Sequence, residues 1–148
     1  MIVNYVLFIC GHNAGRSQMS QAFFNYMKKE FPSVDKAYEA ISAGTRHGDR
    51  INPLVVQAMG EVGIDMNDTT IYFPKGLDGD FVKSRGNNIQ RVIIACDDKC
   101  ELPPQIKSDL IPEYWSLPDP HSQPLEEVRR VRDLTRDRVY SLLGELES

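Results

Sequence analysis

Residues 2–17 read Ile-Val-Asn-Tyr-Val-Leu-Phe-Ile-Cys-Gly-His-Asn-Ala-Gly-Arg-Ser, an apolar run that leads into a loop of small residues. The run from Ile2 to Ile9 is too short for most helices, so it predicts a buried strand. After the loop, apolar side chains recur at the three- and four-residue steps of one helix face: Met19, Ala22, Phe23, Tyr26 and Met27. The stretch therefore predicts a strand, a glycine-containing loop and a helix in direct succession.

The loop is Cys10-Gly11-His12-Asn13-Ala14-Gly15-Arg16-Ser17. A loop in this position aims successive backbone N–H groups at one point, and the dipole of the helix adds positive potential there. Such a field stabilises a thiolate, the nucleophilic form of cysteine. Arg16 offers a planar fork of donors that suits a tetrahedral oxyanion. We therefore expect Gly11 to Arg16 to bind an oxyanion and Cys10 to attack its phosphorus or arsenic.

The alternative is a structural cysteine at a strand end, with Arg16 and Ser17 merely starting the helix. A cysteine and an arginine six residues apart are common by chance. Their place directly after the first strand favours the oxyanion loop, because Gly11 and Gly15 permit unusual backbone angles there.

The composition is that of an ordinary globular protein, since 41% of the 148 residues are hydrophobic and 26% are charged. This length fits a single domain over residues 1–148 that buries a core without disulfides. A net charge of −4 without a basic cluster disfavours a nucleic-acid partner. We expect no membrane association and a cytoplasmic location, because no signal segment or membrane-spanning stretch is evident. Three cysteines, an odd number, favour reduced and reactive thiols over a disulfide framework.

Four short segments predict strands, at Ile2–Ile9, Tyr38–Gly44, Arg91–Ala95 and Tyr114–Ser116. Helices are expected after the first loop, from Asn52 to Gly63, and over the tail from Leu125 to Leu146. Residues 65–88 show no clean period and predict a long loop with at most one short helical piece. This alternation predicts an α/β fold, with a four-stranded parallel sheet flanked by helices on both faces. In such a sheet, the loops after the first, third and fourth strands share one edge, which would gather Cys10, Cys96 and Asp119.

The second and third cysteines stand in Cys96-Asp97-Asp98-Lys99-Cys100. Fully extended, these four steps span roughly 13 Å, but on a helical turn the two Cα atoms lie about 6 Å apart, which permits a reversible disulfide. Cys96 could then attack Cys10 and Cys100 could take over the bond. The alternatives are half of a metal site or two ordinary core thiols. Because the histidines show no ligand spacing, we expect no bound metal.

Asp119 lies between Pro118 and Pro120, a pattern that is usually just a rigid turn. Its predicted place beside Cys10 favours a second role, because a leaving hydroxide or alkoxide needs a proton donor opposite the nucleophile. Ser17 also has two compatible roles, as a hydroxyl at the helix start and as a donor to the Cys10 thiolate. His12 lies inside the predicted loop, where we expect its backbone N–H to matter more than its ring.

Taken together, these motifs resemble the low-molecular-weight tyrosine phosphatase superfamily from Tyr5 to Leu143, and within it the arsenate reductase branch. The segments that carry the resemblance are Cys10 to Met19, Ser42-Ala43-Gly44, Ile51-Asn52-Pro53, Cys96 to Cys100 and Trp115-Ser116-Leu117-Pro118-Asp119-Pro120. Gln18-Met19 is similar to the reductases, whereas the phosphatases usually place proline first. The phosphatases also carry aromatic residues just after the acid, where this chain has His121-Ser122-Gln123.

The resemblance implies that Cys10 attacks arsenate, of which phosphate is an analogue, while Arg16 and the loop amides hold its oxygens. Asp119 would protonate the leaving hydroxyl. Cys96 would then attack Cys10 and release arsenite, and Cys100 would close a Cys96–Cys100 disulfide.

No bound cofactor is implied, only an external thiol reductant. Thioredoxin is expected for the three-cysteine relay, although Cys96 and Cys100 are closer in sequence than the pair of the best-known thioredoxin-coupled members. The Asn13-Ala14-Gly15 segment also resembles members that use a low-molecular-weight thiol and glutaredoxin with Cys10 alone. Some relatives hold potassium partly through an acid where this chain has Gln21, so that ion is not expected.

Two other functions remain open at the level of sequence. A small phosphatase would hydrolyse phosphomonoesters through a Cys10 phosphoenzyme, without needing Cys96 or Cys100. A module that binds oxyanions or senses thiols, without turnover, would use the same loop.

Overall fold

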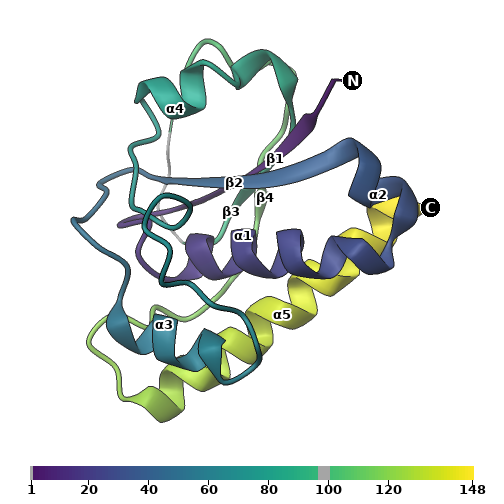
Figure 1. Ribbon diagram of the computed structural model, residues 1–148. Helices are drawn as coiled ribbons and strands as arrows, with labels where there is room; N and C mark the ends of the chain where they lie inside the picture. The colour runs from purple at the N-terminus through teal and green to yellow at the C-terminus, as the bar shows by residue number, and fades with distance from the viewer. Residues whose placement is uncertain (1, 97–100) are drawn as a thin grey trace.

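The centre of the molecule is a parallel sheet (Figure 1). The structure is a computed structural model, and it describes residues 2–96 and 101–148. Within these ranges the strands are β1 (Asn4–Cys10), β2 (Tyr38–Gly44), β3 (Ile89–Ile94) and β4 (Glu113–Tyr114). Their order across the sheet is β2-β1-β3-β4, and all pairs are parallel. The predicted four-stranded parallel sheet is confirmed.

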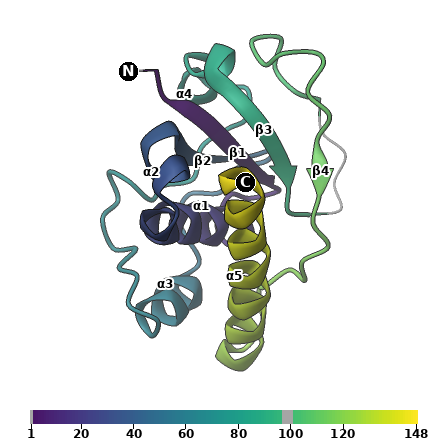
Figure 2. The same ribbon diagram turned by 90° about the vertical axis from the view of Figure 1, so that its right-hand side faces the viewer.

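Helices cover the two faces of the sheet unequally, as Figure 2 shows in side view. On one face lie α1 (Arg16–Met27), α3 (Pro53–Gly60) and α5 (Leu125–Glu147). The other face carries the short helix α4 (Asp80–Lys83). Successive residues of β1 supply both layers, because side chains alternate along a strand. Val6 and Phe8 pack into the core with α1, α3 and α5, whereas Leu7 and Ile9 pack with Leu77 and Val82.

The predicted set of helices was incomplete in two parts of the chain. The segment between α1 and β2 contains a 3-10 turn η1 (Lys28–Glu30) and the helix α2 (Pro32–Ala37), neither of which was predicted. The helix α2 has six residues and buries only Val34, so it leaves no periodic pattern to read. The expected long loop contains two short helical pieces, α4 and η2 (Gly86–Asn88), where one was predicted.

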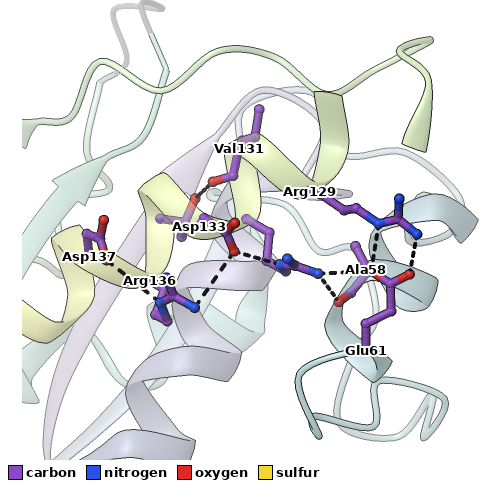
Figure 3. Close-up of polar contacts among 9 residues, drawn as sticks. Ala58, Glu61, Arg129, Val131, Asp133, Arg136 and Asp137 are labelled. Atoms are coloured by element: carbon purple, nitrogen blue, oxygen red, sulfur yellow. Dashed lines mark hydrogen bonds and ion pairs between the residues drawn. The ribbon is translucent and has the colours of Figure 1, made fainter. Parts of the chain in front are cut away.

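Helix α3 is fixed to α5 by charged side chains around Glu61, its C-terminal capping residue (Figure 3). Arg129 donates to both carboxylate oxygens of Glu61, at 2.9 and 2.6 Å. The nearly buried Arg132 donates to Glu61 at 3.0 Å and to the backbone carbonyl of Ala58 at 2.9 Å. Hydrogen bonding by Arg129 lowers the pKa of Glu61 below its ordinary value. These contacts hold α3 in place, and the residues at its start line the cavity described below.

None of the helices in the described ranges combines the length and the apolar character that a bilayer crossing requires.

Candidate active site

The loop after β1 is held by its neighbour, the segment from Thr45 to Asn52. Amides of that segment donate to loop carbonyls at 2.8–3.1 Å, in the pairs Thr45 to Cys10, Arg46 to Gly11, Gly48 to His12 and Asn52 to Ala14. Within the described residues, the amides of residues 11–15 donate to no protein group. The loop therefore keeps a set of backbone donors available, as an oxyanion site requires.

The unusual backbone of the loop lies at Asn13, where φ is +54°. The sequence predicts unusual backbone angles at Gly11 and Gly15, and Gly15 does lie outside the regular regions, at φ −143° and ψ −91°. The left-handed residue, however, is the asparagine, a residue type that tolerates this region. Gly44 at the end of β2 makes room for the loop. A Cβ atom on Gly44 would lie 2.5 Å from the carbonyl oxygen of Gly11 and 3.0 Å from the Cβ of Asn13.

The Cys10 sulfur is buried, with 3% of the residue exposed, and lies 2.8 Å from the Ser17 hydroxyl oxygen. The side-chain amide of Asn13 donates to the same hydroxyl oxygen at 2.7 Å. The orientation of that amide is fixed, because its oxygen accepts from the backbone N–H of Lys75 at 3.0 Å. Since Ser17 accepts from Asn13, its own proton is free to point at the Cys10 sulfur. This geometry suits a serine that stabilises a thiolate.

Arg16 and Asp119 meet across the opening of the loop. Their closest side-chain nitrogen and oxygen are 3.8 Å apart, and Arg16 also donates to the carbonyl of Leu117 at 3.1 Å. The Nε of Arg16 is buried and has no hydrogen-bond partner among the described residues. Asp119 is about half exposed, and its other oxygen accepts from the backbone N–H of His121 at 3.0 Å. The guanidinium thus retains a buried donor for an anion, beside a carboxyl group that is open to solvent.

A cavity of about 390 Å³ opens over the loop and brings these groups together. Its wall comes from the loop itself, from Gly48 and residues 50–53, and from residues 119–122. Cys10, Arg16 and Asp119 all line it. At its rim the rings of His12 and His121 lie 5.6 Å apart, and no Phe, Tyr or Trp is among the described lining residues. The volume suits a small ligand, and the aromatic rings in the described lining are the imidazoles of these two histidines.

Cys96 lies two residues beyond β3 and is buried, with 4% exposed. It belongs to the same hydrophobic cluster as Cys10, but it does not line the cavity. Cys100 falls outside the described residues, so the predicted Cys96–Cys100 pair stays a prediction. The described residues contain no group of three or more His, Cys, Asp or Glu side chains that could hold a metal ion.

Sequence reasoning missed two residues that support the loop from behind. Gln18 is fully buried, and its amide nitrogen donates to the backbone and side-chain oxygens of Asn13 and to the carbonyl of Phe73. Lys75 bonds Asn13 from the long segment before α4. In the sequence, Gln18 stands out only through the resemblance to the reductases, and no periodic pattern marks Lys75.

The chain belongs to the low molecular weight phosphotyrosine protein phosphatase family, whose sequence model matches residues 5–148. Two curated relatives come from bacteria. The arsenate reductase of Staphylococcus aureus is 33% identical over 129 residues, which cover 86% of this chain and 87% of that protein. The glutaredoxin arsenate reductase of a Synechocystis species is 29% identical over 141 residues, which cover 95% and 97% of the two chains.

Solved structures of arsenate reductases share the fold. An arsenate reductase in its phosphate-binding state superimposes with a TM-score of 0.77 at 27% identity, over 97% of this chain and 98% of that one. A thioredoxin-dependent arsenate reductase from Corynebacterium glutamicum gives a TM-score of 0.69 at 27% identity, over 98% of this chain and 62% of the longer one.

Proposed function

We propose that the protein is an arsenate reductase that uses Cys10 as its nucleophile. The observation that carries the proposal is the set of three groups around one small cavity. These are the buried Cys10 sulfur bonded to Ser17, the Arg16 guanidinium with a spare donor, and the Asp119 carboxyl. The relatives described above support arsenate as the substrate, since they carry that activity in their names.

In the first step, the Cys10 thiolate attacks the arsenic of arsenate and forms a sulfur–arsenic bond. The amides of residues 11–15 and Arg16 hold the oxygens of the anion. Asp119 gives its proton to the departing hydroxyl, which leaves as water. Arsenic is still As(V) in this adduct, so the reduction has yet to occur.

In the second step, the Cys96 thiolate attacks the Cys10 sulfur, and the electron pair of the sulfur–arsenic bond leaves with arsenic. Arsenite, As(III), is released, and the two cysteines become a disulfide. Cys100 then attacks Cys96, restores the Cys10 thiolate and closes a Cys96–Cys100 disulfide that an external dithiol reduces. Because Cys96 is buried, this exchange requires its segment to move toward the cavity.

Thioredoxin is the reductant that fits a protein disulfide of this kind. The alternative is a low-molecular-weight thiol that attacks the Cys10 adduct directly, with glutaredoxin reducing the mixed disulfide. The named relatives include a glutaredoxin arsenate reductase and a thioredoxin-dependent one, so the family accommodates both. Either scheme needs reduced thiols, which is why we place the protein in the cytoplasm.

The reductant is tested by measuring arsenite formation with the thioredoxin system and, in parallel, with a small thiol plus glutaredoxin. We expect turnover with thioredoxin in wild type and none in Cys10→Ser. The reaction should stop at the Cys10–arsenic adduct in Cys96→Ser and at the Cys10–Cys96 disulfide in Cys100→Ser. Normal cycling of either latter variant with thioredoxin would contradict the relay. Turnover with the small thiol alone would leave Cys10 as the essential cysteine.

Phosphatase activity is the second candidate, because Cys10, Arg16 and Asp119 can also form and break down a phosphoenzyme and because the family takes its name from that activity. It predicts rapid release of phosphate from an aryl phosphate, loss of that release in Asp119→Asn, and full activity in Cys96→Ser. The described cavity lining contains no Phe, Tyr or Trp side chain, and this disfavours an aryl phosphate as the substrate. Formation of more than one arsenite per protein chain would exclude a module that only binds oxyanions.

A further inference from the structure

Lys75 places an ammonium group in the interior, directly behind the oxyanion loop. Only 6% of the residue is exposed. Its Nζ donates to the carbonyl of Phe73 at 3.0 Å and to the hydroxyl of Ser42 at 3.4 Å. The same nitrogen lies 4.7 and 5.2 Å from the ring centres of Phe73 and Phe81. No carboxylate among the described residues pairs with it, which is unusual for a buried lysine.

The backbone of Lys75 bridges two parts of the site. Its N–H donates to the side-chain oxygen of Asn13 at 3.0 Å, and its carbonyl accepts from the N–H of Gly44 at 2.8 Å. The segment around Lys75 therefore lies between the end of β2 and the loop. The Lys75 side chain also holds that segment, because its Nζ donates to the Phe73 carbonyl and to the Ser42 hydroxyl.

A directed chain of donors leads from Lys75 to the nucleophile. The Lys75 N–H donates to the side-chain oxygen of Asn13, which also accepts from the Gln18 amide, and the amide nitrogen of Asn13 therefore points toward Ser17 at 2.7 Å. Ser17 accepts that bond, which leaves its own proton free to donate to the Cys10 sulfur, 2.8 Å from the hydroxyl oxygen. If the side-chain amide of Asn13 were flipped, its oxygen would face Ser17. Ser17 would then donate its proton to that oxygen and could no longer donate to the Cys10 sulfur.

We propose that Lys75 is a positioning residue for the reaction. Its buried ammonium clamps the 73–75 segment so that the Lys75 N–H holds Asn13, and through Asn13 and Ser17 the Cys10 sulfur, in the attacking geometry. The activity measurements below rest on the proposed reductase function, whereas the alkylation measurement does not.

The charge of the Lys75 ammonium group depends on pH. Burial, and to a smaller extent the positive charge of Arg85, lowers the pKa of Lys75 from 10.5 to about 8. Arg85 is the charged group that acts on it, and its guanidinium carbon lies 3.9 Å from the centre of the Phe81 ring. The polar side chain that Lys75 bonds, Ser42, is uncharged and in turn donates to Gln21 at 2.6 Å. Above about pH 8 the clamp therefore loses its charge.

The test is Lys75→Met, which fills the space between the two rings without the charge, and the control is Lys36→Met on the exposed face of α2. We expect kcat for arsenate to fall about ten- to a hundredfold in Lys75→Met with little change in KM. Wild type should lose kcat as pH rises through about 8, whereas Lys75→Met should lack this alkaline loss. Lys36→Met should match wild type in both.

Melting temperatures separate positioning from folding. The lowered pKa means that the buried charge destabilises wild type below pH 8, and that this penalty is relieved as pH rises toward 10.5. Lys75→Met should thus melt no lower than wild type at pH 7, and its advantage should shrink between pH 8 and 10.5. Unchanged kcat in Lys75→Met, or the same alkaline loss in both proteins, would overturn the proposal.

Alkylation of Cys10 by iodoacetate, followed by peptide mass spectrometry, measures the reactivity of the Cys10 thiolate in the absence of arsenate. We expect alkylation of Cys10 at pH 7 to be about tenfold slower in Lys75→Met than in wild type and in Lys36→Met. Equal rates in all three proteins would overturn the proposal. If wild type reduced no arsenate, the proposed reductase function would fail, and the ratio of alkylation rates would still decide the role of Lys75.

Discussion

At the scale of single residues, reactivity depends on a buried sulfur that packs among apolar side chains and contacts one neutral hydroxyl group among the described residues. The Ser17 hydroxyl lies within hydrogen-bond distance of the Cys10 sulfur. Ser17 is itself fully buried and accepts a hydrogen bond from the side-chain amide of Asn13. A hydrogen bond to a charged group contributes about 1.5–3 kcal/mol, more than one between neutral groups. The hydroxyl therefore matters most when Cys10 is a thiolate, which is its state during the attack on arsenic.

Replacing Ser17 by alanine should slow the first chemical step. We expect kcat to fall about tenfold or more with little change in arsenate binding, because the lost bond is to the nucleophile and not to the anion. Rapid mixing with arsenate, read as loss of the free Cys10 thiol, measures this step. Ser33→Ala, at an exposed position in α2, is the matched control. A Ser17→Ala protein that forms the adduct at the wild-type rate would remove Ser17 from the mechanism.

Four of the predicted site residues could be found from sequence because each follows a recognisable element. Cys10, Arg16 and Ser17 stand where an apolar run ends and a helical period begins, and Asp119 follows a strand of the same sheet. Lys75 could not be found in this way. Its contact with Asn13 joins residues 62 positions apart, and the pairing that creates it depends on how an irregular segment packs.

At the scale of elements, the site is assembled where three segments end side by side. The loop after β1 bonds the segment after β2, and residues 75–77 run alongside through an isolated bridge between Gly44 and Gly76. The strands were predictable, since β1 and the end of β3 are short apolar runs and β2 leads into the turn at Gly44. The helix α2 was not, because six residues with one buried side chain carry no period. Close approaches such as that of Gly44 to the loop leave no trace in hydrophobic patterns.

The close approach at Gly44 gives a prediction for this junction. Gly44→Ala would put a Cβ 2.5 Å from the Gly11 carbonyl oxygen, so the loop must shift. We expect a lower melting temperature and the loss of most phosphate affinity, measured by calorimetric titration. Gly60→Ala is the control, since no atom lies within 4 Å of its Cβ position and alanine favours the helix. Wild-type phosphate binding in Gly44→Ala would show that the loop does not need this packing.

The junction of α3 and α5 gives a prediction with a defined pH dependence. Hydrogen bonding by Arg129 lowers the pKa of Glu61 in the folded protein below 4.5. The stabilisation by Glu61 is therefore present above its unfolded pKa and is lost as pH falls through the folded value. Glu61→Gln should melt lower than wild type at pH 7, and the difference in melting temperature should shrink as pH falls below 4.5. The control is Glu39→Gln, an exposed position on β2; a difference that persists in acid would assign the effect to packing.

At the scale of the whole molecule, one parallel sheet serves two purposes. Its faces divide the core into a thick layer under α1, α3 and α5 and a thinner layer under α4. Its carboxyl edge carries Cys10 at the last position of β1, Cys96 two residues after β3, and Asp119 five residues after β4. Parallel strands place these groups on one edge whatever the loops contain, which explains why the site was predictable from the order of elements. How Cys96 reaches Cys10 depends on motion, which no sequence pattern reports.

The central claim is that the chain itself supplies the two electrons that convert arsenate to arsenite. The most direct test mixes fully reduced protein with excess arsenate and no external thiol, and counts arsenite and remaining thiols. We predict one arsenite per chain and the loss of two thiols in wild type, and no arsenite in Cys10→Ser or Cys96→Ser. A wild-type protein that releases no arsenite until a small thiol is added would contradict the claim.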